Sequence, residues 1–358
     1  MRDLGQPWRL TAVVVLLVLS IVGCGQAPSG DQAALPADST NANAPADSRV
    51  ATPAPQPDAG ATLKIGYSTW VGYGPLFIAR ENQYYEQNGI QVELVKIEDP
   101  KLRFAALAAG QLDGLVSTLD ALALYVKPEL QLKAVLALDT SNGGDGIVAT
   151  TDIASAADLK GKKVAFNPGS VSDFYINYVL QENGMSIEDV ELVNMKQDDA
   201  GAAFVAGKVD AAVTWEPWLS RAKESPNGQI LHDSSQTPGL IVDVLIFRQD
   251  VIEQRKTEVQ GVIAGWMQAI EFYQANQNQA IEIMAEAVGG WLENPEDFAS
   301  TLTGVQYYDA EDNQQFFGAA DSGAFQTAQF AIDLWAAQGK VDESLKAADI
   351  IDNTLLTQ

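Results

Sequence analysis

One fourteen-residue pattern occurs twice in the chain, and it restricts the fold more than any other feature. Residues 105–118 read AALAAGQLDGLVST, and residues 202–215 read AAFVAGKVDAAVTW. Each copy has an amphipathic segment, a glycine (Gly110 or Gly207) that can end a helix at positive φ, and an apolar run. Each copy therefore predicts a helix, a tight turn and a strand of a parallel α/β layer. One copy alone would fit any such layer, but two gapless copies 97 residues apart favour two similar lobes.

The first residues have the pattern of an export signal. Arg2 and Arg9 precede the apolar run TAVVVLLVLSIV, which is too short to cross a bilayer as a stable helix and is typical of a signal peptide. Residues 21–24, IVGC, resemble the lipobox of bacterial lipoproteins, and Cys24 is the only cysteine of the chain. We therefore expect residues 1–24 to be a signal peptide ending at a lipidated Cys24. This predicts a protein of the periplasm or cell surface that contacts a membrane only through its lipid.

Composition separates a tether from the folded part. Residues 25–61 are rich in alanine, proline and aspartate and poor in large apolar residues, which predicts a disordered tether. Roughly 300 residues remain, enough for two modest α/β lobes. The formal net charge of −25 argues against nucleic acid or an anionic membrane surface as a partner.

Strands and helices alternate along the folded part and then give way to helices. Strands are expected at residues 62–69, 90–97, 131–140, 146–150, 163–166, 190–195 and 237–247, and helices at 75–89, 101–110 and within 167–184. Two further helices have apolar faces, which we expect to lie in the core: Val259, Val262, Ile263, Trp266, Ile270 and Tyr273 in one, and Phe325, Phe330, Ile332 and Trp335 in the other.

Five segments, taken in order, resemble a known family. They are KIGYSTWVGYGPLFIA, AALAAGQLDGL, ADLKGKKVAF, AAFVAGKVDAAVTWEPW and GLIVDVLIF. Together they resemble the extracytoplasmic substrate-binding proteins of ABC importers for sulfonates, taurine, nitrate and thiamin precursors. The resemblance implies an α/β fold, the two-lobed type II clamshell of periplasmic binding proteins, with two crossover strands. It also implies lobe 1 at residues 62–150 and 240–358, lobe 2 at 151–239, a ligand between them, and a monomer that delivers it to an ABC permease and ATPase.

The ligand site is expected at the carboxyl ends of the strands, where loops and helix N-termini meet. In this sequence those ends supply twelve candidate ligand-binding residues: Ser68, Trp70, Tyr73, Thr118, Asp120, Ser170, Asp173, Phe174, Gln197, Trp215, Glu216 and Trp218.

Eight of the twelve candidates are acidic or aromatic, and Lys196 is the main basic residue near them. Buried carboxylates are costly unless a positive charge neutralises them, and aromatic faces attract cations by about 0.5 to 2 kcal/mol each. These residues favour a small cationic or zwitterionic nitrogen compound. A planar guanidinium, as in guanidine, fits best, because one carboxylate can accept two of its N–H groups.

Each acid has a second interpretation. Asp120 and Asp173 are equally suited to cap helices, and Glu216 to complement the positive end of the helix that follows. Asp243 lies within a predicted crossover strand, where it is either a hinge residue, which we prefer, or a pocket residue. The tryptophans of TWEPW fit a core as well as a ligand platform.

Other ligands and roles remain open. The helix that starts at Ser170 offers backbone N–H groups to an anion, so alkanesulfonate, taurine, nitrate or a thiamin pyrimidine are alternatives. A pyrimidine-synthase-like enzyme is disfavoured, because the only histidine, His232, lies in a polar stretch and no metal-ligand spacing occurs. We expect no enzyme activity, cofactor or metal. A lipid-anchored sensor would use the same pocket.

Overall fold

The computed structural model describes residues 60–318 and 323–356. The predicted signal peptide, Cys24 and nearly all of the predicted tether lie outside these ranges. Among the described helices, none combines the length and the apolar character that crossing a membrane requires.

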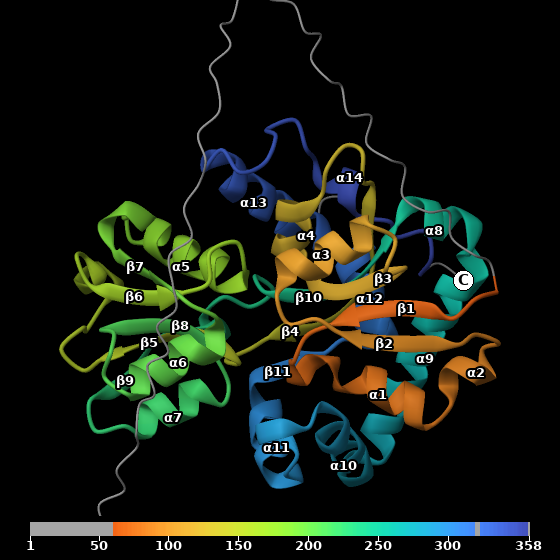
Figure 1. The fold of residues 1–358 in the computed structure, drawn as a ribbon, viewed down its shortest axis with the longest axis horizontal. Helices are drawn as coiled ribbons and strands as arrows, with labels where there is room; N and C mark the ends of the chain where they lie inside the picture. The colour runs from red at the N-terminus through yellow and green to blue at the C-terminus, as the bar shows by residue number, and fades with distance from the viewer. Residues whose placement is uncertain (1–59, 319–322, 357–358) are drawn as a thin grey trace, which may run out of the picture. The chain divides into compact units, whose positions relative to one another are not determined.

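The first sheet has six strands, in the order β11-β4-β10-β3-β1-β2 (Figure 1). Their bounds are β1 Leu63–Tyr67, β2 Val92–Lys96, β3 Gly114–Thr118, β4 Leu132–Ser141, β10 Val242–Arg248 and β11 Val305–Tyr307. Strand β1 pairs in parallel with β2 and β3, whereas β10 runs antiparallel between β3 and β4. The carboxyl ends of β1, β2 and β3 therefore meet at one edge.

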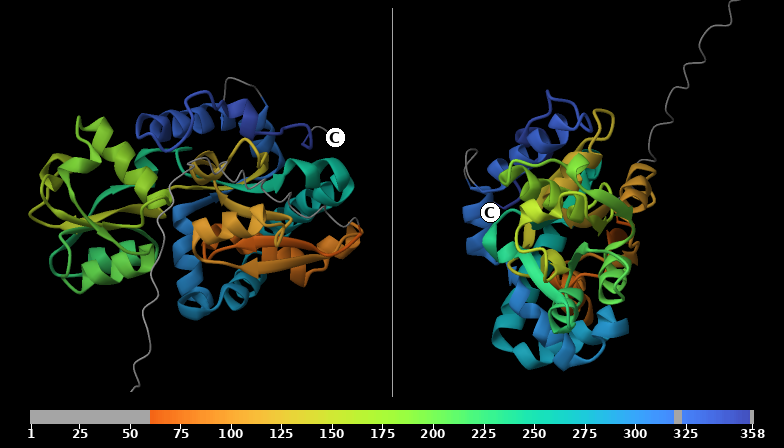
Figure 2. Two further views of the ribbon diagram at one scale, coloured as in Figure 1. Left: turned by 45° about the horizontal axis from the view of Figure 1, so that its top comes forward. Right: turned by 90° about the vertical axis from the view of Figure 1, so that its left-hand side faces the viewer.

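The second sheet has five strands, in the order β7-β6-β8-β5-β9. Their bounds are β5 Asp145–Thr150, β6 Lys163–Phe166, β7 Glu191–Asn194, β8 Ala211–Trp215 and β9 Gly228–Asp233. In Figures 1 and 2 this sheet is the yellow-green part of the chain. The lobe boundaries expected from the sequence stay a prediction. The structure differs from them at one strand. Strand β5, which we had expected in lobe 1, is hydrogen-bonded to β8 and β9 in the second sheet.

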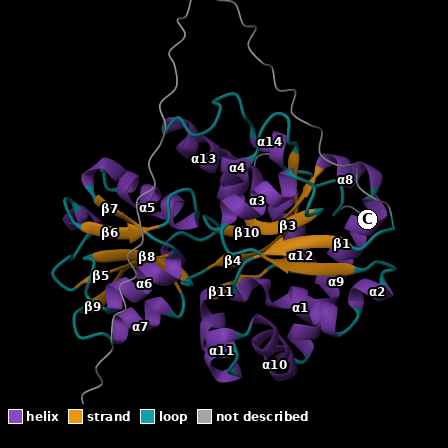
Figure 3. Ribbon diagram, viewed as in Figure 1, coloured by secondary structure: helices purple, strands orange, loops and turns teal. Residues whose placement is uncertain are grey.

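Helices cover both sheets (Figure 3). Those beside the first sheet are α1 Gly74–Glu81, α2 Tyr84–Gln87, α3 Pro100–Ala108, α4 Leu119–Tyr125, α8 Gln249–Gln254, α9 Lys256–Ala275, α10 Gln277–Val288, α11 Pro295–Thr301, α12 Ala310–Phe317, α13 Ala324–Ala337 and α14 Ala347–Ile350. Those beside the second are α5 Val171–Glu182, α6 Gln197–Val205 and α7 Trp218–Glu224. Short 3-10 helices are η1 Val71–Tyr73, η2 Ala156–Leu159, η3 Ile187–Asp189, η4 Ser234–Gln236, η5 Gly290–Leu292 and η6 Leu302–Gly304.

The repeated pattern forms the same unit in each sheet. The first copy contains the end of α3, Gly110 at φ 68° and β3, and the second contains the end of α6, Gly207 at φ 67° and β8. The helix, turn and strand predicted for each copy are confirmed. Because left-handed φ is strained for residues with a Cβ, glycine is needed at both turns.

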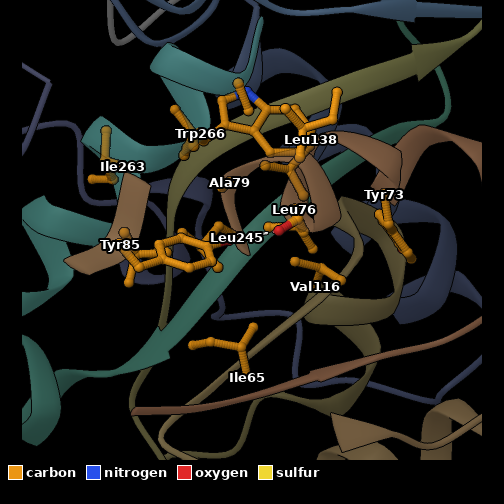
Figure 4. Close-up of a cluster of buried hydrophobic side chains, with 14 of the residues drawn as sticks. Ile65, Tyr73, Leu76, Ala79, Tyr85, Val116, Leu138, Leu245, Ile263 and Trp266 are labelled. Carbon is orange, nitrogen blue, oxygen red and sulfur yellow. Dashed lines mark hydrogen bonds between the residues drawn. The ribbon is translucent and has the colours of Figure 1, made fainter. Parts of the chain in front are cut away.

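Hydrophobic residues form one cluster on each face of each sheet. On one face of the first sheet, Trp266 of α9 packs with Leu138 and Leu245 (Figure 4). The predicted core face of α9 is confirmed for five of its six residues, and Tyr273 is only half-buried. The core prediction for Phe330 of α13 is wrong, because Phe330 is 36% exposed; its ring packs edge to face against the buried Phe174.

Two segments connect the sheets, between β4 and β5 and between β9 and β10. They are bonded to each other: the Ser141 amide donates to the Ile241 carbonyl at 3.1 Å, and the hydroxyls of Ser141 and Ser234 lie 2.7 Å apart. The helix expected over residues 75–89 is interrupted, because Gln83 adopts left-handed φ (57°) between α1 and α2.

Candidate functional site

A cavity of about 60 Å³ lies between residues of the two sheets. This small volume suits a ligand of few heavy atoms. Its lining is Ser68, Trp70, Tyr73, Glu98, Pro100, Arg103, Ser117, Thr118, Ala121, Asp145, Ser170, Val171, Gln197, Trp215, Ile241 and Asp243. Most of these residues end a strand or begin the helix that follows, which is where ligands bind in α/β sheets.

Seven of the twelve candidate residues line this cavity: Ser68, Trp70, Tyr73, Thr118, Ser170, Gln197 and Trp215. They come from the segment after β1 that includes η1, from the ends of β3 and β8, and from the starts of α5 and α6. The rings of Trp70 and Trp215, from different sheets, have centroids 6.2 Å apart and planes tilted by 48°. The other five candidates lie outside the lining.

Three of those five are the acids on which the ligand prediction depended. Glu216 accepts hydrogen bonds from the Ser220 amide (3.1 Å) and hydroxyl (2.9 Å), so it stabilises the start of α7. Asp173 accepts from the Gly169 amide and pairs with Lys340 at 2.8 Å. Both use their charge within the protein. Glu216 does so as its second interpretation proposed, whereas Asp173 is not the cap of its helix, because Ser170 holds the N-cap position of α5.

Asp120 is 2% exposed in the first turn of α4, and neither of its oxygens has a hydrogen-bond partner among the described residues. Thr118, and not Asp120, holds the N-cap position of that helix. Burial raises the pKa of Asp120 to about 7. It therefore neither caps the helix nor lines the cavity.

The two remaining aromatic candidates pack within the protein. Phe174 is fully buried with Trp335 in the core of the first sheet. The Trp218 indole donates to Asp198 at 3.2 Å, and the Arg221 guanidinium lies 4.8 Å from its ring centroid.

Sequence reasoning missed a basic group in the cavity. Arg103 of α3 is 3% exposed; its Nη1 donates to the Ile97 carbonyl at 2.5 Å, and its Nε has no partner among the described residues. Lys196, the expected basic residue, does not line the cavity. The sequence contained a sign that Arg103 is buried. Arg103 lies four residues before Leu107, which places both on the buried face of the helix.

The acids that line the cavity are also different ones. Asp145 and Asp243 are 7% and 3% exposed, and burial raises the pKa of each to about 7. Glu98 also lines the cavity. Burial raises its pKa, but hydrogen bonds from Thr69 together with the hydrogen bond and charge of Lys96 hold the pKa below its usual value. The preferred hinge interpretation of Asp243 did not anticipate this position, whereas the pocket interpretation did.

Asp243 is part of a hydrogen-bonded group behind the cavity. It accepts a short hydrogen bond from the Tyr73 hydroxyl, and it faces Asp139 on the neighbouring strand β4. Asp139 is fully buried and accepts from the Trp70 indole at 3.1 Å. Burial and the neighbouring Asp243 raise the pKa of Asp139 well above its usual value. Since two adjacent buried carboxylates do not both ionise readily, this pair holds a proton at neutral pH.

No group of three or more potential metal ligands occurs among the described residues. His232 lies outside the cavity lining, where its Nδ1 is 2.6 Å from the Tyr175 hydroxyl.

Two sheets joined by two crossing segments, with a cavity between them, define the periplasmic-binding-protein fold. Solved structures share it: the alkanesulfonate-binding protein SsuA from Xanthomonas axonopodis pv. citri, bound to MOPS, matches with a TM-score of 0.63 and 23% identity, over 83% of this chain and all of that one. The chain belongs to the NMT1/THI5-like family, whose model matches residues 70–280.

Curated relatives include binding proteins. A Brucella abortus protein named as a binding protein without a stated ligand is 26% identical over 63% of this chain and 70% of its own length. The taurine-binding periplasmic protein of Escherichia coli is 24% identical over 73% of this chain and 82% of its own length.

Proposed function

We propose that this protein is the extracytoplasmic solute-binding component of an ABC importer and that it captures a small organic cation. The family and the binding proteins among its relatives support the first part. The names of those relatives describe binding, which supports a role without catalysis. The predicted signal peptide and lipidated Cys24 would hold the protein outside the cytoplasm, facing the permease.

The main observation in favour of a cationic ligand is the pair of buried carboxyl groups in the cavity lining. Asp145 comes from the second sheet and Asp243 from the first, so a ligand between them contacts both. The rings of Trp70 and Trp215 add faces that attract a cation. The small volume favours a compact ion, and guanidinium is our best candidate, because its planar N–H groups match carboxylates and indole faces.

An anion is the second candidate, and Arg103 favours it. This guanidinium group lines the cavity with its Nε unpaired among the described residues, close to Ser170 and Val171 at the start of α5. A sulfonate or nitrate could accept from Arg103, and a zwitterion such as taurine could use both ends.

Titration calorimetry with guanidinium chloride, ethanesulfonate, taurine and nitrate separates these candidates. For a cation, Asp243→Asn keeps the size of the side chain but removes one charge, so guanidinium affinity should fall roughly 30-fold or more, from a loss of about 2 to 5 kcal/mol. Sulfonate affinity should stay the same or rise. Guanidinium binding that is unchanged in Asp243→Asn would contradict the proposal.

Glu216→Gln is the matched control. It also removes one carboxylate charge beside the second sheet, but Glu216 contacts α7 and not the cavity. We expect guanidinium affinity within about twofold of wild type, a change below about 0.5 kcal/mol.

A further inference from the structure

Four aspartates with little exposure lie in the cavity lining or next to it. Asp145 and Asp243 line the cavity and are 7% and 3% exposed. Asp139, opposite Asp243, and Asp120, which influences Asp243 electrostatically, lie outside the lining and are 0% and 2% exposed. Arg103 is the only basic residue among the described residues of the lining, so it is the only positive side chain there. One guanidinium group cannot neutralise four carboxylates, and an isolated buried carboxylate binds a proton instead of staying ionised. Some of these four carboxyls are therefore protonated at neutral pH.

The aspartates differ in how many of their carboxyl oxygens accept hydrogen bonds. Asp243 and Asp139 face each other across neighbouring strands, and donors from the same loop reach both, the Tyr73 hydroxyl to Asp243 and the Trp70 indole to Asp139. The second oxygen of Asp139 and both oxygens of Asp120 have no partner within the described parts of the chain. Burial therefore outweighs the few donors near these two carboxyls, and it raises the pKa of both.

The remaining titratable neighbours do not supply that charge. The groups that influence the pair or its neighbours are Tyr73 from η1, Glu98, Asp99 and Arg103 from the β2–α3 region, Asp120 from α4, Asp145 from β5, Asp173 from α5, and Tyr307 and Tyr308 at β11. Except for Arg103, all of these groups are acidic or neutral. Two lysines also lie beside them, but each already pairs with an acid, Lys340 with Asp173 at 2.8 Å and Lys96 with Glu98 at 3.1 Å. Burial raises the pKa of Asp120, Asp145 and Asp243 to about 7, so these protons are near the point of release.

We propose that the cavity exchanges a proton for its ligand: when a small organic cation binds, an aspartate of this cluster, foremost Asp243, releases a proton to water. This inference rests on the proposed function, because it takes the ligand to be a cation. The carboxyl O–H bond breaks, its electron pair stays on the carboxylate, and the proton leaves. The cavity gains one positive charge and loses one, so its net charge is unchanged.

Exchange makes binding dependent on pH. If one proton leaves per cation, guanidinium affinity rises about tenfold per pH unit below about pH 7 and levels off above it, where Asp243 is already ionised. Urea has nearly the same size and shape but no charge, so its binding should release no proton.

The test measures released protons directly. Guanidinium chloride is added to the protein in unbuffered potassium chloride, and a pH-stat counts protons at about pH 6 and about pH 8.5, on either side of the raised pKa values. Sulfonate buffers are avoided, because sulfonates are the rival ligands. Calorimetry in phosphate gives the affinity at both pH values.

We expect close to one proton per bound guanidinium at the lower pH and far less at the higher one. Asp243→Asn should weaken binding and abolish most of the release. Asp152→Asn, which removes a surface acid with a 70% exposed side chain, should leave the release unchanged.

Guanidinium binding with no proton release at either pH would overturn the exchange and leave the proposed function standing. Failure of guanidinium to bind, with ethanesulfonate binding instead, would overturn both. The wild-type measurement decides this even if a variant fails to fold.

Discussion

At the scale of single residues, the molecule separates acids that are used within the fold from acids that face the cavity. Glu216 accepts a hydrogen bond at the start of α7, and Asp173 pairs with Lys340. Asp145 and Asp243 line the cavity with raised pKa values. Both kinds are aspartates or glutamates next to strands, and what distinguishes them is which donors lie within hydrogen-bond distance.

Asp120 gives a prediction about stability. Its pKa is raised to about 7 in the folded protein, above the usual value of 3.8, so the folded state binds its proton more tightly than the unfolded state does. Its contribution to stability is therefore greatest below about pH 4 and is lost as pH rises toward and past 7, by at most about 4 kcal/mol. Asp120→Asn cannot ionise, so relative to wild type it should be more stable at pH about 8 than at pH about 5.

Thermal unfolding of both proteins at the two pH values, followed by circular dichroism, checks this expectation. The same difference between variant and wild type at both pH values would mean that Asp120 is not a buried titrating group.

At the scale of elements, the repeat has the same hydrogen bonds in both copies. Asp113 accepts from the Lys64 amide at 2.8 Å at the start of β1, and Asp210 accepts from the Lys163 amide at 2.8 Å at the start of β6. Each aspartate thus holds the neighbouring parallel strand to its own turn. This explains why the aspartate is present in both copies, a role that the sequence pattern alone did not reveal.

These two aspartates should differ in how much they stabilise the fold. Asp210→Ala should lower the free energy of unfolding by about 1 kcal/mol, the net value of one hydrogen bond. Asp113→Ala should cost more, about 1 to 3 kcal/mol, because Asp113 also pairs at 3.3 Å with Arg255, whose side chain is 1% exposed. Thermal unfolding of both variants at one pH compares them, and a larger cost for Asp210→Ala would contradict this account.

At the scale of the whole molecule, side chains from both sheets line the cavity, and two crossing segments connect those sheets. A ligand that contacts Asp145 and Asp243 together favours the arrangement in which both reach it. We expect small-angle scattering of the protein without residues 1–60 to show compaction at saturating guanidinium chloride. An unchanged radius of gyration would argue against closure on the ligand.

The predicted lipid anchor is tested separately. Cys24→Ser removes the only thiol and hence the proposed acyl acceptor, so the expressed protein should be recovered in the soluble fraction or as an uncleaved precursor. Detergent partitioning compares it with wild type. Identical membrane retention without lipid would show that Cys24 is not the anchor.

By itself the sequence determined most of the elements around the cavity and the edge at which they meet, although it did not predict β9 or β11. Local signals are enough for this, since apolar periodicity, Gly110 and Gly207 act over a few residues, and the carboxyl ends of parallel strands share an edge whatever their side chains. Seven of the twelve candidate residues reached the cavity for that reason. Only the tertiary structure decided which acids face it and that Arg103 joins them. That choice depends on donors brought from distant parts of the chain, such as Tyr73 to Asp243 and Lys340 to Asp173, and no spacing along the sequence encodes those distances.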